Sequence, residues 1–432
     1  MRRRGSAILF VVIEYQGPEE RAYLVGVPMA GDSSVEASAL LAELRALTET
    51  LGLETVGQEL APVREVTSRY YLGSGKAQEI AARAADVGAD VIVFDQELSP
   101  SQQRNWEKLC ERSVTDRQGI ILEIFAERAH TREAHLQVEL ARMEYNLPRL
   151  TSAWSHLSRQ RGGRRGTRGE GETQLEVDRR TIQQRIATVK RELLDVGSQR
   201  STMRHQREKL PVPTGSIVGY TNAGKSCLLR ALTGSDVLVA DKLFATLDPA
   251  TRRLELEGGQ EVLLTDTVGF IRRLPHGLVD AFRSTLEETL YAAFLIHVID
   301  ASDPSARAHA VTTHAVLDEI GSNSKPTITV LNKIDRLTNA ARRDVGIDFP
   351  DGIEVSAVTG EGLDTLRVAI TKTVASTYSR IEVELPHSRY DLAALIHRTG
   401  HVISERYSDL AVCILADVPR RTEQMIEEFR TP

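Results

Sequence analysis

Apolar and polar positions alternate in short segments over the first 130 residues. Apolar runs predict strands at 7–13, at 22–27 and at Val91–Phe94, the last followed by Asp95. Helical spacing predicts helices at 35–51 and 75–85, and Ser99-Pro100 is typical of the start of another. Because strands and helices alternate, we expect residues 1–130 to form an α/β domain with a parallel sheet.

Residues 131–210 have a different pattern, in which apolar positions are spaced four and three residues apart in turn. One such seam comprises Leu136, Leu140, Met143, Leu147 and Leu150, and a second comprises Ile182, Ile186, Val189, Leu193 and Val196. The segment between the seams, 159–171, contains glycine at a density that no helix sustains. We therefore predict an antiparallel helical arm with this segment as its tip loop. An ordinary helical linker between domains is the alternative.

The prolines in Pro211-Val212-Pro213 end the preceding helical pattern and indicate the start of a new domain. Strands and helices alternate again over 211–378, which predicts a second α/β domain. The remaining segment, 379–432, contains the strand Ile381–Leu385 and an apolar run at 410–415, so it is expected to form a small C-terminal α/β domain.

Composition and charge narrow the function classes. The chain of 432 residues carries a net charge of −6, so any nucleic-acid contact must be confined to a patch. The segment 159–209 is a candidate for such a patch, because it contains 14 Lys and Arg residues and only 7 Asp and Glu residues. The three cysteines have no paired spacing, which indicates a reducing compartment. No apolar run approaches the roughly 20 residues of a membrane span, so we expect a cytoplasmic or peripheral protein. We also expect it to be a monomer in solution.

A phosphate-binding loop is indicated at Gly219–Ser226, which fits G-x-x-x-x-G-K-S between a strand and a helix. Small residues let backbone N–H groups close around phosphate, and the helix N-terminus favours the anion. Lys225 is expected to reach the β- and γ-phosphates, and the Ser226 hydroxyl to bind Mg²⁺.

Downstream residues supply the remaining parts of such a site. The apolar strand 263–264 leads into Asp266, a candidate Mg²⁺ ligand, and Gly269 can bring its N–H to the γ-phosphate. Thr246 has the position of a switch threonine that closes on Mg²⁺.

Base recognition is predicted from Asn332-Lys333-Ile334-Asp335, which follows an apolar strand. The carboxylate of Asp335 can accept from the N1–H and 2-amino donors of guanine, whereas adenine would leave it unpaired. We expect Lys333 to pack along the base, Asn332 to brace the loop, and the Ala357 N–H, at the end of the strand 355–357, to donate to guanine O6.

These motifs together predict a GTPase that converts GTP to GDP and phosphate. Candidate catalytic residues are Lys225, Thr246 and Gly269, and candidate Mg²⁺ ligands are Ser226, Thr246 and Asp266. The full set of candidate nucleotide-binding residues is Gly219, Tyr220, Thr221, Asn222, Ala223, Gly224, Lys225, Ser226, Cys227, Phe244, Ala245, Thr246, Asp266, Thr267, Val268, Gly269, Asn332, Lys333, Asp335, Ser356, Ala357 and Val358. The fold class is thus multidomain α/β: an N-terminal α/β domain with a long helical hairpin arm, a P-loop GTPase domain with a Ras-like doubly wound sheet, and the small C-terminal domain.

Two positions affect the hydrolysis chemistry. Phe270 stands where Ras-like enzymes carry a glutamine that orients water, and phenylalanine can do no such work. Asn222 stands where potassium-activated GTPases place an asparagine that binds K⁺, which this sequence resembles there. The alternative is that Asn222 only braces the loop by hydrogen bonding.

The tip loop carries the arginines Arg159, Arg161, Arg164, Arg165 and Arg168, with no acid between them. Arginine suits RNA phosphates and stacks on exposed bases, so these residues are candidate RNA contacts, with a solvated flexible loop as the alternative. Leu72–Lys76 looks similar to a phosphate loop, but it lacks the first glycine and is expected to be a turn and helix start.

The chain resembles the HflX family of ribosome-associated GTPases along nearly its whole length. The stretches that carry the resemblance are 72–76 with Glu79-Ile80, 94–102, 136–141, 166–176, 244–249 and 266–271. The resemblance implies binding to the large ribosomal subunit and its RNA near the peptidyl-transferase centre, splitting of stalled or idle ribosomes, and ribosome-stimulated hydrolysis. The family's loop is usually richer in glycine, and Arg164-Arg165 make this one more basic.

Two other functions are compatible with parts of the sequence. A tRNA-modification or ribosome-assembly GTPase would share the nucleotide motifs but lack the arm. An RNA-remodelling ATPase in the N-terminal domain, also ascribed to the family, would need a second complete phosphate loop, and the sequence has none.

Overall fold

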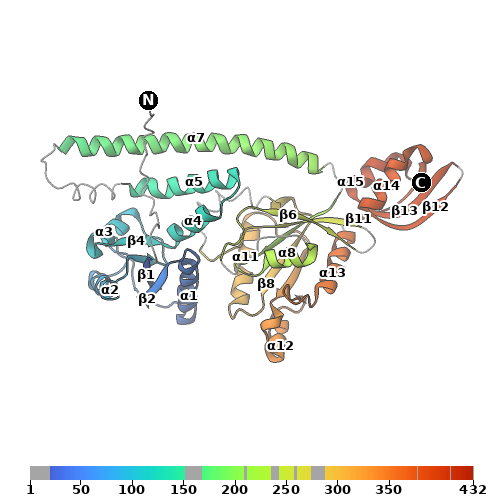
Figure 1. The fold of residues 1–432 in the computed structure, drawn as a ribbon. Helices are drawn as coiled ribbons and strands as arrows, with labels where there is room; N and C mark the ends of the chain where they lie inside the picture. The colour runs from blue at the N-terminus through green and yellow to red at the C-terminus, as the bar shows by residue number, and fades with distance from the viewer. Residues whose placement is uncertain are drawn as a thin grey trace. The chain divides into compact units, whose positions relative to one another are not determined.

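The computed structural model describes residues 20–150, 168–208, 212–234, 243–256, 260–273, 288–376, 378–408 and 410–431. It consists of two compact units (Figure 1). The first contains Met1–Glu127 and His135–Leu193, and the second contains Arg128–Ala134 and Leu194–Pro432. Each unit has cores and sheets of its own and is described separately.

The first unit is built on a four-stranded sheet. Its strands lie in the order β2-β1-β3-β4 and all pair in parallel, as the alternation of strands and helices predicted. The strands are β1 (Arg21–Gly26), β2 (Glu54–Leu60), β3 (Val91–Phe94) and β4 (Ser113–Asp116), and the helices are α1 (Ser34–Thr50), α2 (Ser74–Asp86), α3 (Pro100–Cys110) and α4 (Arg117–Arg128). Leu72–Lys76 forms a turn and the start of α2, as expected.

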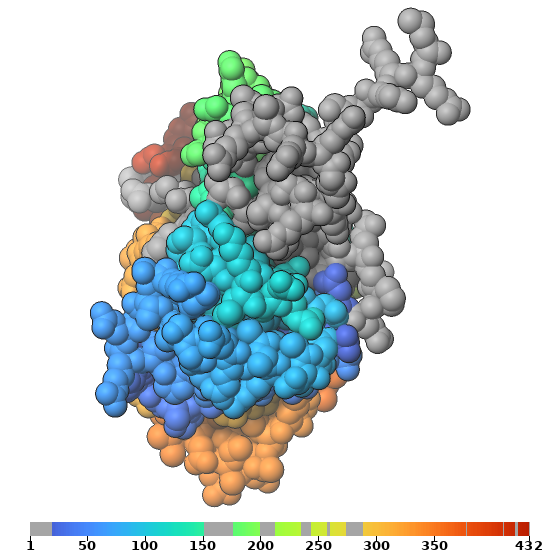
Figure 2. Space-filling model, turned by 90° about the vertical axis from the view of Figure 1, so that its left-hand side faces the viewer, coloured from blue at the N-terminus to red at the C-terminus, as the bar shows by residue number. Residues whose placement is uncertain are grey.

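Helices cover both faces of this sheet, because alternate side chains of a strand point to opposite faces. Tyr23 and Val25 of β1 pack in one core with Ile80 of α2 and Trp106 of α3. On the opposite face, Leu41 of α1 lies against the backbone of β1 at Gly26. The unit is therefore a three-layer α/β structure, and Figure 2 shows one face of it in blue and cyan.

The α3 helix begins at a capping box. The Ser99 hydroxyl accepts from the Gln102 N–H at 3.2 Å, and the Gln102 side chain accepts from the Ser99 N–H at 2.9 Å. Pro100 occupies the first turn, where its missing N–H costs no hydrogen bond. This start was predicted from Ser99-Pro100, and it fixes the position of Trp106 in the core.

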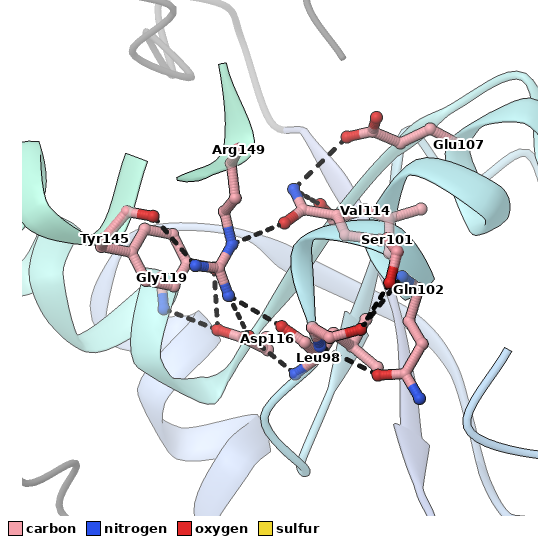
Figure 3. A network of polar contacts seen from close by, with 11 residues as sticks. Leu98, Ser101, Gln102, Glu107, Val114, Asp116, Gly119, Tyr145 and Arg149 are labelled. Atoms are coloured by element: carbon pink, nitrogen blue, oxygen red, sulfur yellow. Dashed lines mark hydrogen bonds and ion pairs between the residues drawn. The ribbon is translucent and has the colours of Figure 1, made fainter. Parts of the chain in front are cut away.

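A buried polar network lies at the carboxyl end of β4 (Figure 3). The Asp116 carboxylate accepts from the Leu98 N–H at 3.0 Å, from the Tyr145 hydroxyl at 2.9 Å and from the Arg149 guanidinium at 3.4 Å. Arg149 also donates to the Leu98 carbonyl at 2.8 Å and stacks over the Tyr145 ring at 3.6 Å. The network thereby attaches the segment that follows α5 to the end of the sheet.

The arm contains two helices, α5 (Arg132–Asn146) and the 41-residue α7 (Arg168–Glu208), which lie side by side in Figure 1. Within the first unit they are joined by ion pairs between Arg185 and Glu139 and between Lys190 and Glu144, each at 2.8 Å. Leu136, Met143, Ile182 and Val189 of the two predicted seams are buried.

One seam is shorter in the structure than its spacing suggested. α5 ends at Asn146, and Leu147–Arg149 forms the 3-10 turn η1. Pro148 has no N–H to continue the helix, so the pattern at Leu147 and Leu150 overshot the helix end.

The second unit contains a six-stranded sheet in the order β10-β9-β8-β5-β7-β6, parallel except for the antiparallel pair β6-β7. Its strands are β5 (Thr214–Gly219), β6 (Ala250–Glu255), β7 (Glu261–Asp266), β8 (Phe294–Asp300), β9 (Thr327–Asn332) and β10 (Ile353–Glu354). The main helices are α8 (Lys225–Thr233), α11 (Ala306–Glu319), α12 (Asn339–Asp348) and α13 (Leu363–Ser376). The carboxyl ends of β5, β7 and β9 share one edge, which is where ligands bind in such sheets.

A small antiparallel sheet of β11 (Tyr378–Pro386), β12 (His401–Tyr407) and β13 (Ala411–Pro419) completes the second unit, in the order β11-β13-β12. It packs with α14 (Tyr390–Thr399) and α15 (Arg420–Ile426) around a core that includes Ile396 and Ile414. The strands at Ile381–Leu385 and around 411–415 were predicted, and β12 was not. Among the described helices, none is both long and apolar enough to cross a membrane.

We predict that Asp116→Ala lowers the free energy of unfolding of the first unit by about 3–5 kcal/mol, because it removes the buried carboxylate that accepts from Leu98, Tyr145 and Arg149. Denaturant unfolding should be followed by tryptophan fluorescence with Trp154→Phe in both proteins. Trp106, in the core of this unit, is then the only tryptophan of the chain.

The matched control is Glu49→Ala, which removes an exposed ion pair with Arg45 and should cost less than about 0.5 kcal/mol. Equal shifts for the two substitutions would contradict a stabilising role for the network.

Candidate functional site

The phosphate loop lies between β5 and α8, as the motif required. Gly224 precedes α8 with φ of +91°, and a Cβ there would lie 2.3 Å from the Asn332 side chain, so glycine is needed for both reasons. The Lys225 ammonium is buried and donates to the carbonyls of Gly219 at 3.2 Å and Tyr220 at 3.0 Å. Burial lowers the pKa of Lys225 to about 8, and the nearby Asp266 opposes that shift.

The three candidate Mg²⁺ ligands come together from three separate segments. The Asp266 Oδ2 accepts from the Ser226 hydroxyl at 2.6 Å and from the Thr246 hydroxyl at 2.9 Å, and the two hydroxyl oxygens are 2.7 Å apart. The other carboxylate oxygen, Asp266 Oδ1, is buried with no partner among the described residues. Burial raises the pKa of Asp266. An oxygen-only ligand set with an unpaired buried carboxylate oxygen fits a hard cation such as Mg²⁺.

Gly269 lies where its backbone can approach a phosphate. A Cβ at this position would lie 2.6 Å from the Thr221 Cα and 2.9 Å from the Lys225 ammonium. Any side chain would therefore push apart the phosphate loop and the segment that follows β7. This close packing brings the two segments that were predicted to hold the γ-phosphate into contact.

Phe270 turns into the interior. Its side chain is buried in an apolar cluster with Val218 and Leu295, and its backbone pairs with the phosphate loop. The Phe270 N–H donates to the Gly219 carbonyl at 3.1 Å, and the Thr221 N–H donates to the Phe270 carbonyl at 2.7 Å. At the position of the Ras-like glutamine, the backbone is therefore hydrogen-bonded to the phosphate loop, and the side chain packs in the core and does not line the pocket.

The base-recognition segment is braced against the phosphate loop. The Asn332 amide donates to the Ala223 carbonyl at 2.9 Å, which is the bracing role predicted for it. The Lys333 ammonium donates to the Asn222 carbonyl at 2.8 Å and pairs with Asp300 at 2.6 Å. Asp300 was missed in the sequence, although its position at the carboxyl end of β8 is the signal that could have identified it.

Asp335 and the segment after β10 form the other side of this region. The Asp335 carboxylate accepts from the Ser356 hydroxyl at 2.6 Å. The Ala357 N–H, expected to donate to guanine O6, donates in this structure to the Asn332 carboxamide oxygen at 3.1 Å. The strand expected to end at 355–357 ends earlier, since β10 covers only Ile353–Glu354.

Sixteen of the candidate nucleotide-binding residues line one pocket in the described part of the second unit. Its predicted members are Thr221, Asn222, Gly224, Lys225, Ser226, Cys227, Phe244, Ala245, Thr246, Thr267, Gly269, Asn332, Lys333, Asp335, Ala357 and Val358. Arg336 also lines the pocket and was not predicted, although it directly follows Asp335.

The other candidate nucleotide-binding residues are buried and do not line the pocket. They are Gly219, Tyr220, Ala223, Asp266, Val268 and Ser356. Tyr220 stacks on His309, with ring centroids 3.7 Å apart, and its hydroxyl accepts from the Arg272 N–H at 2.9 Å. Its side chain therefore stabilises the phosphate loop through contacts outside the pocket.

The candidate RNA contacts are not placed by the structure. Arg159, Arg161, Arg164 and Arg165 lie outside the described residues, and of Arg168 only the helical backbone is described. Among the described residues, no cluster of His, Cys, Asp or Glu could hold a metal on its own. The candidate Mg²⁺ site differs from such a cluster because two of its three ligands are hydroxyls.

Three models of known families match successive parts of the chain. Residues 38–126 match the model of the GTP-binding GTPase N-terminal region, and 128–207 match the GTP-binding GTPase middle region. Residues 214–333 match the 50S ribosome-binding GTPase model.

Individual relatives extend the similarity over almost all of the chain. The GTPase HflX of Akkermansia muciniphila is 46% identical over 433 residues, which cover 98% of this chain and 99% of the relative. The GTPase HflX of Escherichia coli is 44% identical over 372 residues, covering 85% of this chain and 86% of the relative. Among solved structures, a GTP-binding protein from Sulfolobus solfataricus in complex with GDP is 26% identical, with a TM-score of 0.43, over 82% of this chain and 98% of that one.

If Asp335 pairs with the guanine donors, Asp335→Asn should weaken GTP binding by at least about 10²-fold and admit xanthosine triphosphate. The amide places a donor opposite the 2-oxo acceptor of xanthine, and its oxygen can still accept from Ser356. Titration with the two nucleotides measures the preference. Asp351→Asn, an exposed substitution with the same change of charge, should leave it unchanged. A preference that stays with GTP in the Asp335 variant would contradict the assignment.

Proposed function

The chain belongs to the HflX family of GTPases, and from that premise we propose that it binds the large ribosomal subunit and splits stalled or idle ribosomes into subunits. The observation that carries the proposal is the arm. Its two helices, except for the last residue of α7, and the basic segment between them fall within the matched middle region at 128–207. The description of the matched GTPase model, 50S ribosome-binding GTPase, also favours a ribosomal partner.

In this proposal, hydrolysis of GTP uses the pocket of the second unit. The Lys225 ammonium would leave the loop carbonyls it now contacts to neutralise charge on the β- and γ-phosphates, and the Gly269 N–H would donate to the γ-phosphate. Ser226, Thr246 and Asp266 would hold Mg²⁺, which supplies positive charge between the phosphates when bound. Asp335 would accept from the guanine ring.

The buried side chain of Phe270 means that another group must help to position water and neutralise charge. One source would be the ribosome, through ordering of the segments that carry Thr246 and Gly269. A second would be K⁺ bound by Asn222, which lines the pocket. Asn222 has a φ of +59°, a conformation that asparagine tolerates better than most residues.

The base of the loop is where the first unit contributes to ribosome binding in this proposal. Arg149 lies ten residues before the loop segment 159–171 in the sequence and is held by Asp116, Leu98 and Tyr145 at the end of the sheet (Figure 3). A fixed base would limit the positions that the arginines Arg159, Arg161, Arg164, Arg165 and Arg168 can reach. Ribosomal RNA is the proposed partner because its phosphates and unstacked bases suit arginine.

We propose the organisation into domains at 1–130, 131–210, 211–378 and 379–432, with the arm antiparallel and its loop at 159–171. We also infer that the protein acts as a monomer in the cytoplasm, partly bound to ribosomes.

Incubation of 70S ribosomes with the protein, followed by density-gradient separation, tests the function directly. With GTP or a non-hydrolysable analogue, we expect loss of the 70S peak and recovery of both subunits. Replacement of Arg161, Arg164, Arg165 and Arg168 by Gln should prevent splitting and leave intrinsic hydrolysis unchanged. Each lost RNA contact should also reduce the slope of log affinity against log salt by about 0.7.

The charge-matched control replaces four exposed arginines elsewhere, Arg45, Arg69, Arg307 and Arg343, by Gln. Splitting by the loop variant at the normal rate would reject the proposed role of the loop. Intact 70S ribosomes with the unmodified protein, accompanied by binding to immature subunits or tRNA, would favour an assembly or tRNA-modification GTPase.

The K⁺ hypothesis predicts that GTP hydrolysis is about tenfold faster in KCl than in NaCl at equal ionic strength. That effect is smaller than the roughly 10³-fold or more that an arginine finger supplies. Asn222→Gly, which tolerates the positive φ but lacks the carboxamide, should abolish the difference. Equal rates in the two salts, with and without large subunits, would leave ordering by the ribosome as the explanation.

A further inference from the structure

A contact within the second unit links the nucleotide pocket to the start of α5. Asp248 lies two residues after Thr246, and its carboxylate accepts three hydrogen bonds from two consecutive residues. Its Oδ2 accepts from the His130 N–H at 3.0 Å and the Thr131 N–H at 3.1 Å, and its Oδ1 accepts from the Thr131 hydroxyl at 2.5 Å. These donors belong to the segment Arg128–Ala134, which is part of the second unit.

Thr131 is also the cap of α5. Its hydroxyl oxygen accepts from the Ala134 N–H at 3.2 Å, which satisfies one of the free N–H groups in the first turn of that helix. The carboxylate of Asp248 therefore fixes both the backbone and the capping side chain at the point where the chain enters the arm. A negative charge near a helix N-terminus adds to this interaction.

The segment that carries Asp248 is attached to the pocket at two further points. The Phe244 N–H donates to the Thr221 hydroxyl of the phosphate loop at 2.9 Å. Thr246 donates to Asp266 at 2.9 Å, and Leu247 beside it is buried. Two residues of extended chain span at most about 7 Å, so Asp248 cannot keep its place when Thr246 moves beyond that reach.

We propose that Asp248 is a positioning residue that couples the nucleotide state to the first turn of α5. With GTP and Mg²⁺ bound, Thr246 stays with Ser226 and Asp266, and Asp248 holds His130 and Thr131. After phosphate release Thr246 loses its ligand, and the hold of Asp248 on Thr131 weakens. The inference rests on the proposed role of Thr246, and it does not depend on whether the arm binds the ribosome or another partner.

Thermodynamic linkage predicts the direction in which the coupling changes the relative affinities for a GTP analogue and GDP. A contact that forms more completely in the GTP state must strengthen binding of a GTP analogue relative to GDP by the same factor. The substitution Asp248→Asn removes the charge and turns one acceptor oxygen into a donor, so the carboxamide cannot accept all three hydrogen bonds. We expect it to lower the preference for the analogue over GDP by about tenfold.

Amide hydrogen exchange of the full-length protein tests the coupling at the contact itself. We expect the amides of 130–134 to exchange more slowly with a non-hydrolysable GTP analogue than with GDP, and Asp248→Asn to abolish that difference. The matched control is Asp344→Asn on α12, an exposed position with the same change of charge, which should keep it.

Substitutions on the other side of the contact separate coupling from local damage. Thr131→Val removes the hydroxyl with little change of shape and should reduce nucleotide preference as Asp248→Asn does, whereas Thr131→Ser keeps the hydroxyl and should restore it. The double variant Asp248→Asn/Thr131→Val should lose much less than the sum of the two single effects, because both remove one interaction.

The outcomes are distinct. If exchange at 130–134 is the same with both nucleotides in the unmodified protein, the coupling is overturned, and the role of Thr246 as a Mg²⁺ ligand is untouched by that result. If the nucleotide difference is present but survives Asp248→Asn, or if Thr131→Val leaves nucleotide preference unchanged, Asp248 does not couple the two regions and the inference is overturned while the role of Thr246 stands.

Discussion

The nucleotide site depends on the buried carboxylate of Asp266. It lies at the end of β7, and one of its oxygens accepts from a hydroxyl on α8 and from a hydroxyl on the segment that precedes β6. Burying an ionised group is costly unless other groups compensate its charge. Lys225, on the other side, contributes part of that compensation and lowers the pKa of Asp266 against the effect of burial. Three segments distant in sequence are therefore held at one point by the need to satisfy a single charge.

The backbone of Phe270 shows how this arrangement limits the chemistry of the pocket. Its N–H and carbonyl pair with the phosphate loop, and its side chain fills the core beneath β5 and β8. The position therefore contributes to the stability of the site and supplies no group that could orient water. Any group that orients water must therefore come from another position or from a binding partner, as the proposed function assumes.

In the first unit, buried ion pairs and hydrogen bonds join α1 and the segment after α5 to the ends of β3 and β4. Arg117 is buried and pairs with Asp95 at 2.6 Å and with Glu43, which ties the ends of β3 and β4 to α1. Asp116, the next residue along the chain, holds Arg149 and Tyr145. Both networks lie at the carboxyl end of the sheet, where related folds bind ligands. In this unit the carboxylates at that end, Asp95 and Asp116, are paired with Arg117 and Arg149 of the same chain. This end of the sheet is therefore where the segment after α5 is attached.

Local sequence determined the elements and the chemistry of the pocket. Alternating strands and helices predicted the two α/β sheets, Ser99-Pro100 predicted a helix start, and the spacing of small residues around Lys225 predicted the phosphate loop, because each of these patterns acts over a few neighbouring residues. The tertiary structure decided what depends on distant partners. It buried Phe270 and Tyr220, paired Asp300 with Lys333, and brought Asp248 to Thr131. Those contacts join residues up to 117 positions apart, and no local pattern of spacing or polarity specifies which distant groups will satisfy a given charge.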